Sequence, residues 1–263
     1  MNGAVSFREA DAGIDWSGAP FVSRMANCPA NGDVLVVGTD NVWRTDNFFS
    51  AISSPGWASN SPEIGQGITA LAFAPSSATC ETYAYGLGRG GLFVTTNADA
   101  SWSNLDPSGQ VPGRQITGLD FHPTDGNTLY VTLSGFDGGS PSTTGHLFKT
   151  TNALAGSPTW SNISPPVNIP HNAVRIDRGA PNTVYVATDI GVWRTTDGGT
   201  AWTYMGPEVG MPNVAVYDIR VSDGSGRLVA FTHGRGAFTL GSVTPTTPKP
   251  PRRLPPRARP PSR

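Results

Sequence analysis

Two aspartates, Asp40 and Asp189, stand just before matching Val-Trp-Arg-Thr segments at residues 42–45 and 192–195. Hydrolysis of a glycosidic bond needs two carboxyl groups flanking the bond, about 5 to 9.5 Å apart. Asp40 and Asp189 are the first pair to consider for this chemistry, as acid and base in either order. Aspartate is also an ordinary residue of hairpin turns, and this structural use is the favoured interpretation.

Charged and imidazole side chains in the connections between predicted strands are candidates for ligand binding. The candidates are Arg89, His171, His233 and Arg235, with Asp137, Arg114, Glu63 and Glu208 in similar connections. Together they could bind a sugar or a peptide terminus. Each histidine is more often a solvated or capped residue than a ligand. The sequence contains no phosphate-binding loop, serine nucleophile elbow or His-Glu-x-x-His motif, so we expect no cofactor and no metal ion.

The segments around these residues read as short strands. Apolar and polar residues alternate, and β-branched and aromatic residues are enriched, as is typical of strands. The predicted first strands of each unit are 68–73, 116–121, 173–176 and 217–221; the second strands are 34–37, 82–85, 128–132, 183–187 and 228–232. No segment has a sustained helical period, so we expect almost no helix.

A repeated motif follows these strands. An apolar-aromatic pair, one or two threonines, Asp or Asn and then a tryptophan recur five times, most completely at 192–202 and 92–102. The Asp or Asn residues are Asp11, Asn47, Asn97, Asn152 and Asp197, and the tryptophans are Trp16, Trp57, Trp102, Trp160 and Trp202. Such Asp or Asn side chains can accept backbone N–H bonds within a turn, and each tryptophan is expected to bury its ring between sheets.

The segment Thr195–Trp202 resembles the Asp-box, or BNR repeat, of sialidases, sortilin-type propellers, xyloglucanase-like glycoside hydrolases and photosystem II assembly factors. The resemblance covers residues 3 to about 241. It implies an all-β fold, a β-propeller of about four to five four-stranded antiparallel blades, and it places the candidate ligand-binding connections on one face. Sialidase activity is disfavoured because the Arg-Ile-Pro motif of that family is absent.

We expect two regions: a propeller at 1–243 and a disordered Pro/Arg-rich tail at 244–263. The predicted strand at 4–8 duplicates a strand type present in the last unit, which favours part of a larger propeller. The tail holds six of the 18 Lys and Arg residues and none of the 19 acidic ones, so residues 1–243 carry a net charge of -7. This acidic body disfavours nucleic-acid binding.

The chain lacks a recognisable signal peptide and any apolar run long enough to span a membrane. Buried free thiols are the favoured interpretation of Cys28 and Cys80, and a single disulfide is the alternative. We expect a module of an exported protein that binds a carbohydrate or protein ligand. The alternative is a glycoside hydrolase of the sialidase or xyloglucanase-like type.

Overall fold

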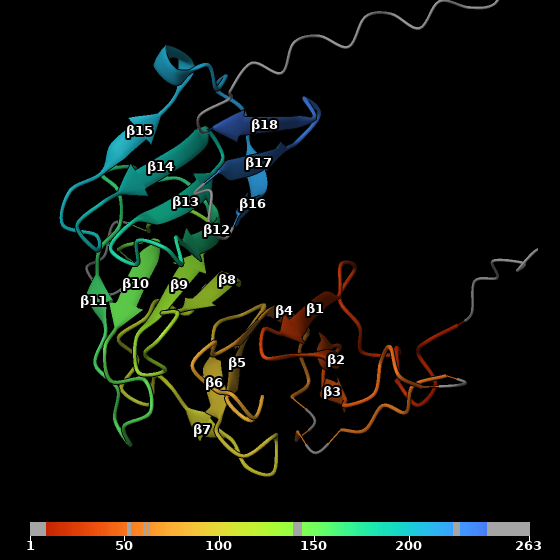
Figure 1. Ribbon diagram of the computed structural model, residues 1–263. Coiled ribbons are helices and arrows are strands. Elements are labelled where there is room, and N and C mark those ends of the chain that lie inside the picture. The colour runs from red at the N-terminus through yellow and green to blue at the C-terminus, as the bar shows by residue number, and fades with distance from the viewer. Residues whose placement is uncertain are drawn as a thin grey trace, which may run out of the picture.

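The computed structural model describes residues 9–51, 54–59, 61–62, 64–138, 144–222 and 227–240. They form five antiparallel sheets, which are the five blades of a β-propeller arranged in an arc around a central hollow (Figure 1). The predicted fold class is thereby confirmed. The predicted strand at 4–8, Glu63 and the tail at 244–263 lie outside the described residues.

Successive strands pair within each blade, with the first strand nearest the hollow. Blade 1 contains β1 (Arg24–Cys28), β2 (Asn31–Gly38) and β3 (Val42–Thr45). Blade 2 contains β4 (Ile68–Phe73), β5 (Tyr83–Leu87), β6 (Leu92–Thr95) and β7 (Ser103–Asn104). Blade 3 contains β8 (Ile116–Phe121), β9 (Leu129–Leu133), β10 (Leu147–Thr150) and β11 (Ser161–Asn162).

Blade 4 contains β12 (His171–Ile176), β13 (Val184–Thr188), β14 (Gly191–Thr195) and β15 (Thr203–Met205). Blade 5 contains β16 (Val216–Val221), β17 (Leu228–Thr232) and β18 (Ala237–Leu240). Among the described residues, the short 3-10 turn η2 (Pro207–Val209) is the helical element assigned, and no helix is long and apolar enough to cross a membrane.

The apolar cores lie between neighbouring blades. Every residue of β5, β9 and β13 is buried, because these second strands are covered on both faces. Blades also approach closely where a glycine replaces a side chain. A Cβ atom on Gly38 would lie 2.6 Å from Ile68 Cγ2, and one on Gly86 would lie 2.3 Å from Ile116 Cγ2. These glycines therefore allow a second strand to contact the first strand of the next blade.

The turn after the third strand of blade 4 closes around Asp197. Its Oδ1 atom accepts hydrogen bonds from the Thr195 hydroxyl at 2.6 Å and from the backbone N–H groups of Thr200 and Ala201 at 2.9 and 3.0 Å. Equivalent bonds reach Asn97 from Ser101 N at 3.0 Å, and Asn152 from Thr159 N at 2.9 Å. Asp and Asn thus supply the same acceptor in three successive blades.

Asn47 and Asp11 make different contacts among the described residues. The Oδ1 atom of Asn47 accepts the Thr45 hydroxyl, while the next backbone N–H groups, at Phe49 and Ser50, donate to Asp33 Oδ1. The carboxylate of Asp33 therefore closes this turn. Asp11 instead accepts a hydrogen bond from the indole of Trp16.

Four of the five repeated tryptophans are buried or half-buried: Trp57, Trp102, Trp160 and Trp202. Three of them donate their indole N–H to a backbone carbonyl N-terminal to their own blade: Trp57 to Ala10 at 2.7 Å, Trp160 to Leu105 at 2.8 Å and Trp202 to Ile163 at 2.8 Å. Trp16, in contrast to this expectation, is 44% exposed.

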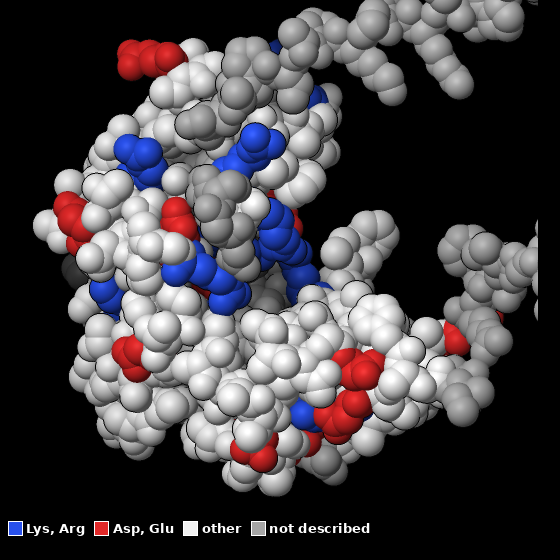
Figure 2. Space-filling view, in the orientation of Figure 1, with Lys and Arg blue, Asp and Glu red and all other residues white. Residues whose placement is uncertain are grey.

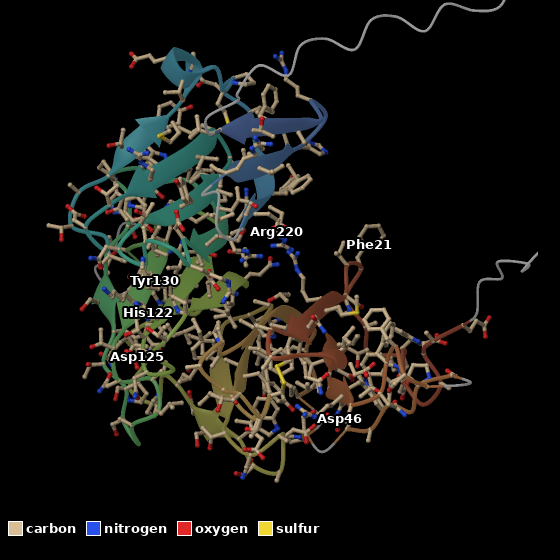
Figure 3. All side chains as sticks on the ribbon, viewed as in Figure 1. Phe21, Asp46, His122, Asp125, Tyr130 and Arg220 are labelled. Carbon is tan, nitrogen blue, oxygen red and sulfur yellow. A yellow bond between two sulfur atoms is a disulfide. The ribbon has the colours of Figure 1, made fainter. Side chains whose placement is uncertain are left out.

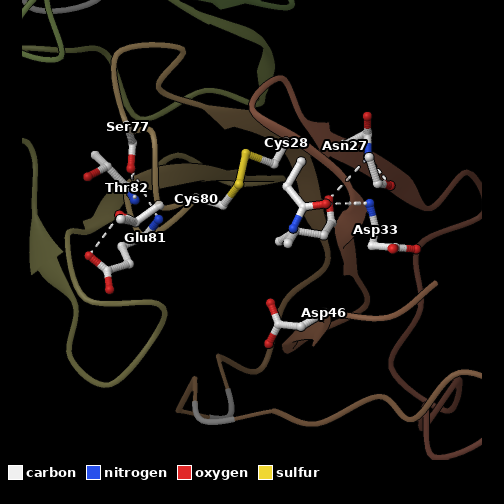
Figure 4. Close-up of a disulfide and its surroundings, with 12 residues drawn as sticks. Asn27, Cys28, Asp33, Asp46, Ser77, Cys80, Glu81 and Thr82 are labelled. Carbon is white, nitrogen blue, oxygen red and sulfur yellow. Dashed lines mark hydrogen bonds between the residues drawn. A yellow bond between two sulfur atoms is a disulfide. The ribbon is translucent and has the colours of Figure 1, made fainter. Parts of the chain in front are cut away.

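The two cysteines form a disulfide, so the favoured prediction of free thiols is wrong (Figure 4). Cys28 ends β1 in blade 1, and Cys80 lies in the loop between β4 and β5 in blade 2. Both cysteines are buried, which is the part of the free-thiol prediction that is correct. The bond joins two neighbouring blades, which sequence spacing could not show.

Candidate ligand-binding channel

The central hollow opens into a cavity of about 610 Å³ at the end where the innermost strands begin. All five blades contribute to its wall. The lining residues are Pro20, Phe21, Val22, Arg24, Thr69, Gln115, Thr117, Ser134, Asn172, Tyr217 and Asp218. Two aromatic rings stand among hydroxyl, amide and charged groups, a combination suited to binding a polar organic ligand. We call this cavity the upper cavity.

A repeated β-bulge places four of these side chains at the upper cavity. The register of pairing shifts near the start of β4, β8, β12 and β16, and the extra residues are Thr69, Thr117, Asn172 and Tyr217. A bulge re-aims the side chain of its extra residue and is common beside functional sites. The same local irregularity in four blades therefore produces one ring of side chains.

Side-chain hydrogen bonds join each innermost strand to the next around this ring. Each bond runs from a polar side chain to a backbone carbonyl of the following blade. They are Arg24 Nε to Thr69 O at 3.1 Å, Thr69 Oγ1 to Ile116 O at 2.6 Å, Thr117 Oγ1 to His171 O at 2.5 Å and Asn172 Nδ2 to Val216 O at 3.0 Å. The wall of the channel is thus fixed by directional contacts as well as by apolar packing.

The two predicted carboxylates have separate surroundings. Asp40 accepts the Thr39 hydroxyl at 3.1 Å, and its carboxylate packs under Gly18, where a Cβ would lie 2.1 Å away. Asp189 accepts the Asn172 amide at 2.9 Å and thereby orients a side chain of the upper cavity. Neither aspartate lines the upper cavity itself. Their action as an acid–base pair stays a prediction.

The predicted basic and imidazole residues are dispersed. Arg89 and Arg235 are exposed in hairpin turns outside the upper cavity. His233 is exposed and packs edge-on against the ring of Tyr217, with ring centroids 5.3 Å apart. His171 is fully buried, so its ring is shielded from a ligand in the channel. The side chain of His233 and the backbone carbonyl of His171 each contact a residue of the upper cavity, Tyr217 and Thr117 respectively.

A partly buried polar network beside the channel includes two residues that the sequence singled out, Arg114 and Asp137. Arg114 Nη2 lies 3.3 Å from Asp137 Oδ1, and its Nη1 lies 3.2 Å from His146 Nδ1. Since arginine can only donate, Nδ1 of His146 is the acceptor. The Nε2–H of His146 then donates toward Asp137 Oδ1 and Asn168 Oδ1, both at 3.1 Å.

The His171 ring stacks on His146, with centroids 5.0 Å apart, and its Nδ1 atom lies 2.9 Å from Ile169 O. Burial lowers the pKa of His171 from 6.5 to about 3, and the positive charge of Arg114 acts in the same direction. Burial also lowers the pKa of His146. Both rings are therefore neutral at pH 7, and the network stabilises the junction of blades 3 and 4.

We expect His171 to make the fold sensitive to acid. Between pH 6.5 and about 3 the unfolded chain binds a proton at residue 171 that the folded chain excludes. Stability therefore falls as the pH falls through this window, by at most about 1.4 kcal/mol per pH unit for this group. Urea unfolding of His171→Gln at pH 7, 5.5 and 4.5 should show a shallower pH dependence than the parent chain. The exposed-site control His233→Gln should keep the parent slope; an unchanged slope in His171→Gln would contradict the prediction.

Comparison with known proteins found a curated relative and several solved structures that are similar to this chain. No protein-family model matches the chain. A xyloglucanase from Paenibacillus sp. is 27% identical over an alignment of 259 residues. The match covers 81% of this chain and 24% of that protein. The chain thus spans about a quarter of the curated relative. An ancestral GH74 enzyme matches with a TM-score of 0.61 and 17% identity, over 86% of this chain and 29% of the enzyme.

The GH74 enzyme of Niastella koreensis matches with a TM-score of 0.56 and 23% identity, over 82% of this chain and 36% of the enzyme. These matches show a β-propeller. At such sequence identities the solved structures support the fold alone, and the function must be argued from the site. Within the described residues, no three His, Cys, Asp or Glu side chains gather as a metal site.

Proposed function

We propose that the chain is a glycoside-hydrolase-related propeller whose upper cavity binds a polysaccharide. The observation that carries this proposal is the ring of bulged residues Thr69, Thr117, Asn172 and Tyr217, supplied by four blades. Sugar rings pack on aromatic faces and exchange hydrogen bonds with hydroxyl and amide groups. The 27% identical xyloglucanase supports a β-glucan chain as the first ligand to test.

We also propose that the repeated turns belong to the Asp-box type and that the protein is exported. The shared acceptor at Asn97, Asn152 and Asp197 supports the first proposal. The disulfide between Cys28 and Cys80 supports the second, because such bonds persist mainly in oxidising compartments outside the cytosol. Export places the protein where polysaccharides occur.

Tyr217 is the residue whose loss should affect polysaccharide binding most directly. Its ring is 52% exposed at the upper cavity. We expect Tyr217→Ala to weaken binding of xyloglucan oligosaccharides by about three- to tenfold, since aromatic contacts contribute about 0.5–1.5 kcal/mol beyond their buried area. Isothermal titration calorimetry measures the effect. The matched control is Phe231→Ala on the adjacent strand β17, which removes an exposed ring that does not line the cavity.

Two outcomes would contradict binding at this site: no affinity of the parent chain for the oligosaccharides, or equal affinity of Tyr217→Ala and the parent. Release of reducing sugars from xyloglucan then separates hydrolysis from binding alone. Hydrolysis that is lost in both Asp40→Asn and Asp189→Asn would support the predicted carboxylate pair. Binding without hydrolysis would favour the glycan-binding module, the reading that the sequence favoured.

A further inference from the structure

Four arginines gather in the channel below the upper cavity. Arg24, Arg175, Arg178 and Arg220 line two adjoining cavities of about 380 and 70 Å³ together with two carboxylates, Asp120 and Asp218. We call this part the lower channel. Blue atoms mark basic residues at the hollow in Figure 2, and Figure 3 shows Arg220 projecting into it from blade 5. These four are a third of the 12 Lys and Arg residues in positions 1–243.

Two carboxylates stand among four arginines, so the lower channel has an excess of positive charge. Asp218 lies 3.3 Å from Arg175 Nη2 and 3.0 Å from Arg220 Nη2, so one carboxylate serves two guanidinium groups. Asp120 accepts the backbone N–H of Ile176 at 2.7 Å. Among the described residues, Arg24 has no carboxylate partner and donates through Nε to a carbonyl, which leaves both of its Nη groups for other acceptors.

The mutual effect of the arginines shows the same excess of positive charge. Burial lowers the pKa of Arg220; the charges of Arg175 and Arg24 act in the same direction, and those of Asp218 and Asp120 oppose them. Arg24 is exposed to the channel, and the Arg220 side chain is 57% exposed. A concave wall of one charge sign focuses its field on a ligand of the opposite sign. This wall is positive although residues 1–243 have a net charge of -7.

We infer that the lower channel binds a carboxylate-bearing saccharide, such as an oligomer of uronic acid. A guanidinium group matches the two oxygens of a carboxylate through paired N–H donors. Arg24 and Tyr217 line both the upper cavity and the smaller lower cavity, so a single chain of sugars can occupy both. A neutral polysaccharide needs no such charge, and the inference therefore extends beyond the proposed function without resting on it.

Calorimetry of the whole chain with trigalacturonate and with neutral galactotriose tests the inference. We expect trigalacturonate to bind at least about tenfold more tightly, and Arg24→Gln and Arg220→Gln each to weaken it by about tenfold, as for loss of a hydrogen bond to a charged group. Raising the ionic strength should weaken trigalacturonate binding in the parent chain. Lys149→Gln is the control: it removes a charge from β10, outside the lower channel, and should leave the affinity unchanged.

Arg24→Gln is the more decisive variant because Arg24 has no ion pair with a described residue to lose, and a thermal unfolding scan checks that it folds. Equal affinity for the two trisaccharides, no binding of trigalacturonate, or unchanged affinity in folded Arg24→Gln would each overturn the inference. Tighter binding of a glutamate oligopeptide than of trigalacturonate would overturn the saccharide class. Loss of xyloglucan binding alone would refute the proposed function and leave this inference standing.

Discussion

Replacing both cysteines by serine is expected to lower the free energy of unfolding by about 4 kcal/mol. The bond between Cys28 and Cys80 closes a loop of the chain with a sequence separation of 52. Such a closure restricts the unfolded ensemble more than a short loop does. Guanidinium unfolding of the oxidised parent and of the double variant measures the difference.

The reducing agent provides the control for this prediction. Reductant should destabilise the parent chain toward the stability of the double variant, and it should leave the variant unchanged. Equal stability of the oxidised parent and the double variant would contradict a stabilising bond between the blades.

The location of the disulfide adds a local expectation. Blade 1 lies at one end of the arc, so it packs strongly against blade 2 but has no comparable neighbour among the described residues on its other side. In repeat-like architectures, an end unit depends heavily on its one interface. Hydrogen exchange in the double variant should therefore increase most in β1, β2 and β3.

The first and second strands of blades 2 to 5 follow from local pattern, and β1 does not. Segments such as Ile68–Phe73 and Val184–Thr188 alternate or concentrate apolar residues and form strands where the pattern predicts them. Strand β1, Arg24–Cys28, lacks β-branched and aromatic residues and has mostly exposed side chains. It is a strand because it pairs with β2 and packs against β4. The residues of β1 themselves give no local indication of this pairing.

The sequence repeat alone did not predict that the bulged residues form the wall of one cavity. In the observed strands β4, β8, β12 and β16, the residues Thr69, Thr117, Asn172 and Tyr217 each occupy the second position. These residues form a ring because each is the extra residue of a bulge, and bulges have no simple sequence signature. The charged residues of the hairpin turns, such as Arg89 and Arg235, lie outside this cavity, and their role in ligand binding stays a prediction.

Long-range geometry accounts for the other differences. Arg24, Arg175 and Arg220 belong to blades 1, 4 and 5, and they meet only because five blades curve around one axis. The cysteines pair because the end of β1 lies against the loop after β4, although they are far apart in the chain. Asp33 closes the turn after β3 in place of Asn47, since it lies opposite that turn across the hairpin. Each outcome depends on how blades or strands are placed.

Replacing Trp202 by alanine is expected to cost about 3 to 5 kcal/mol, the range for large aromatic side chains removed from a core. Its ring packs between blades 3 and 4 against a buried cluster that includes Tyr130, Leu147 and Val186. Its indole also donates to Ile163 O at 2.8 Å, just after β11. The variant therefore loses apolar contacts and a directional bond between blades. Trp16→Ala is the matched control from the same motif, and it should cost far less because that ring is 44% exposed.

Phenylalanine variants separate the two contributions of the repeated tryptophan. Trp102 packs against Tyr83 and Tyr85, but its buried indole N–H has no hydrogen-bond partner in the part of the chain that the structure describes. Trp202→Phe should therefore cost about 1 kcal/mol more than Trp102→Phe, because it also leaves the Ile163 carbonyl without its donor. Urea unfolding of the two variants measures this difference. Equal losses in the free energy of unfolding would assign the stabilising effect of the tryptophan to ring packing alone. A smaller loss for Trp202→Phe would contradict a role for the indole hydrogen bond in joining successive blades.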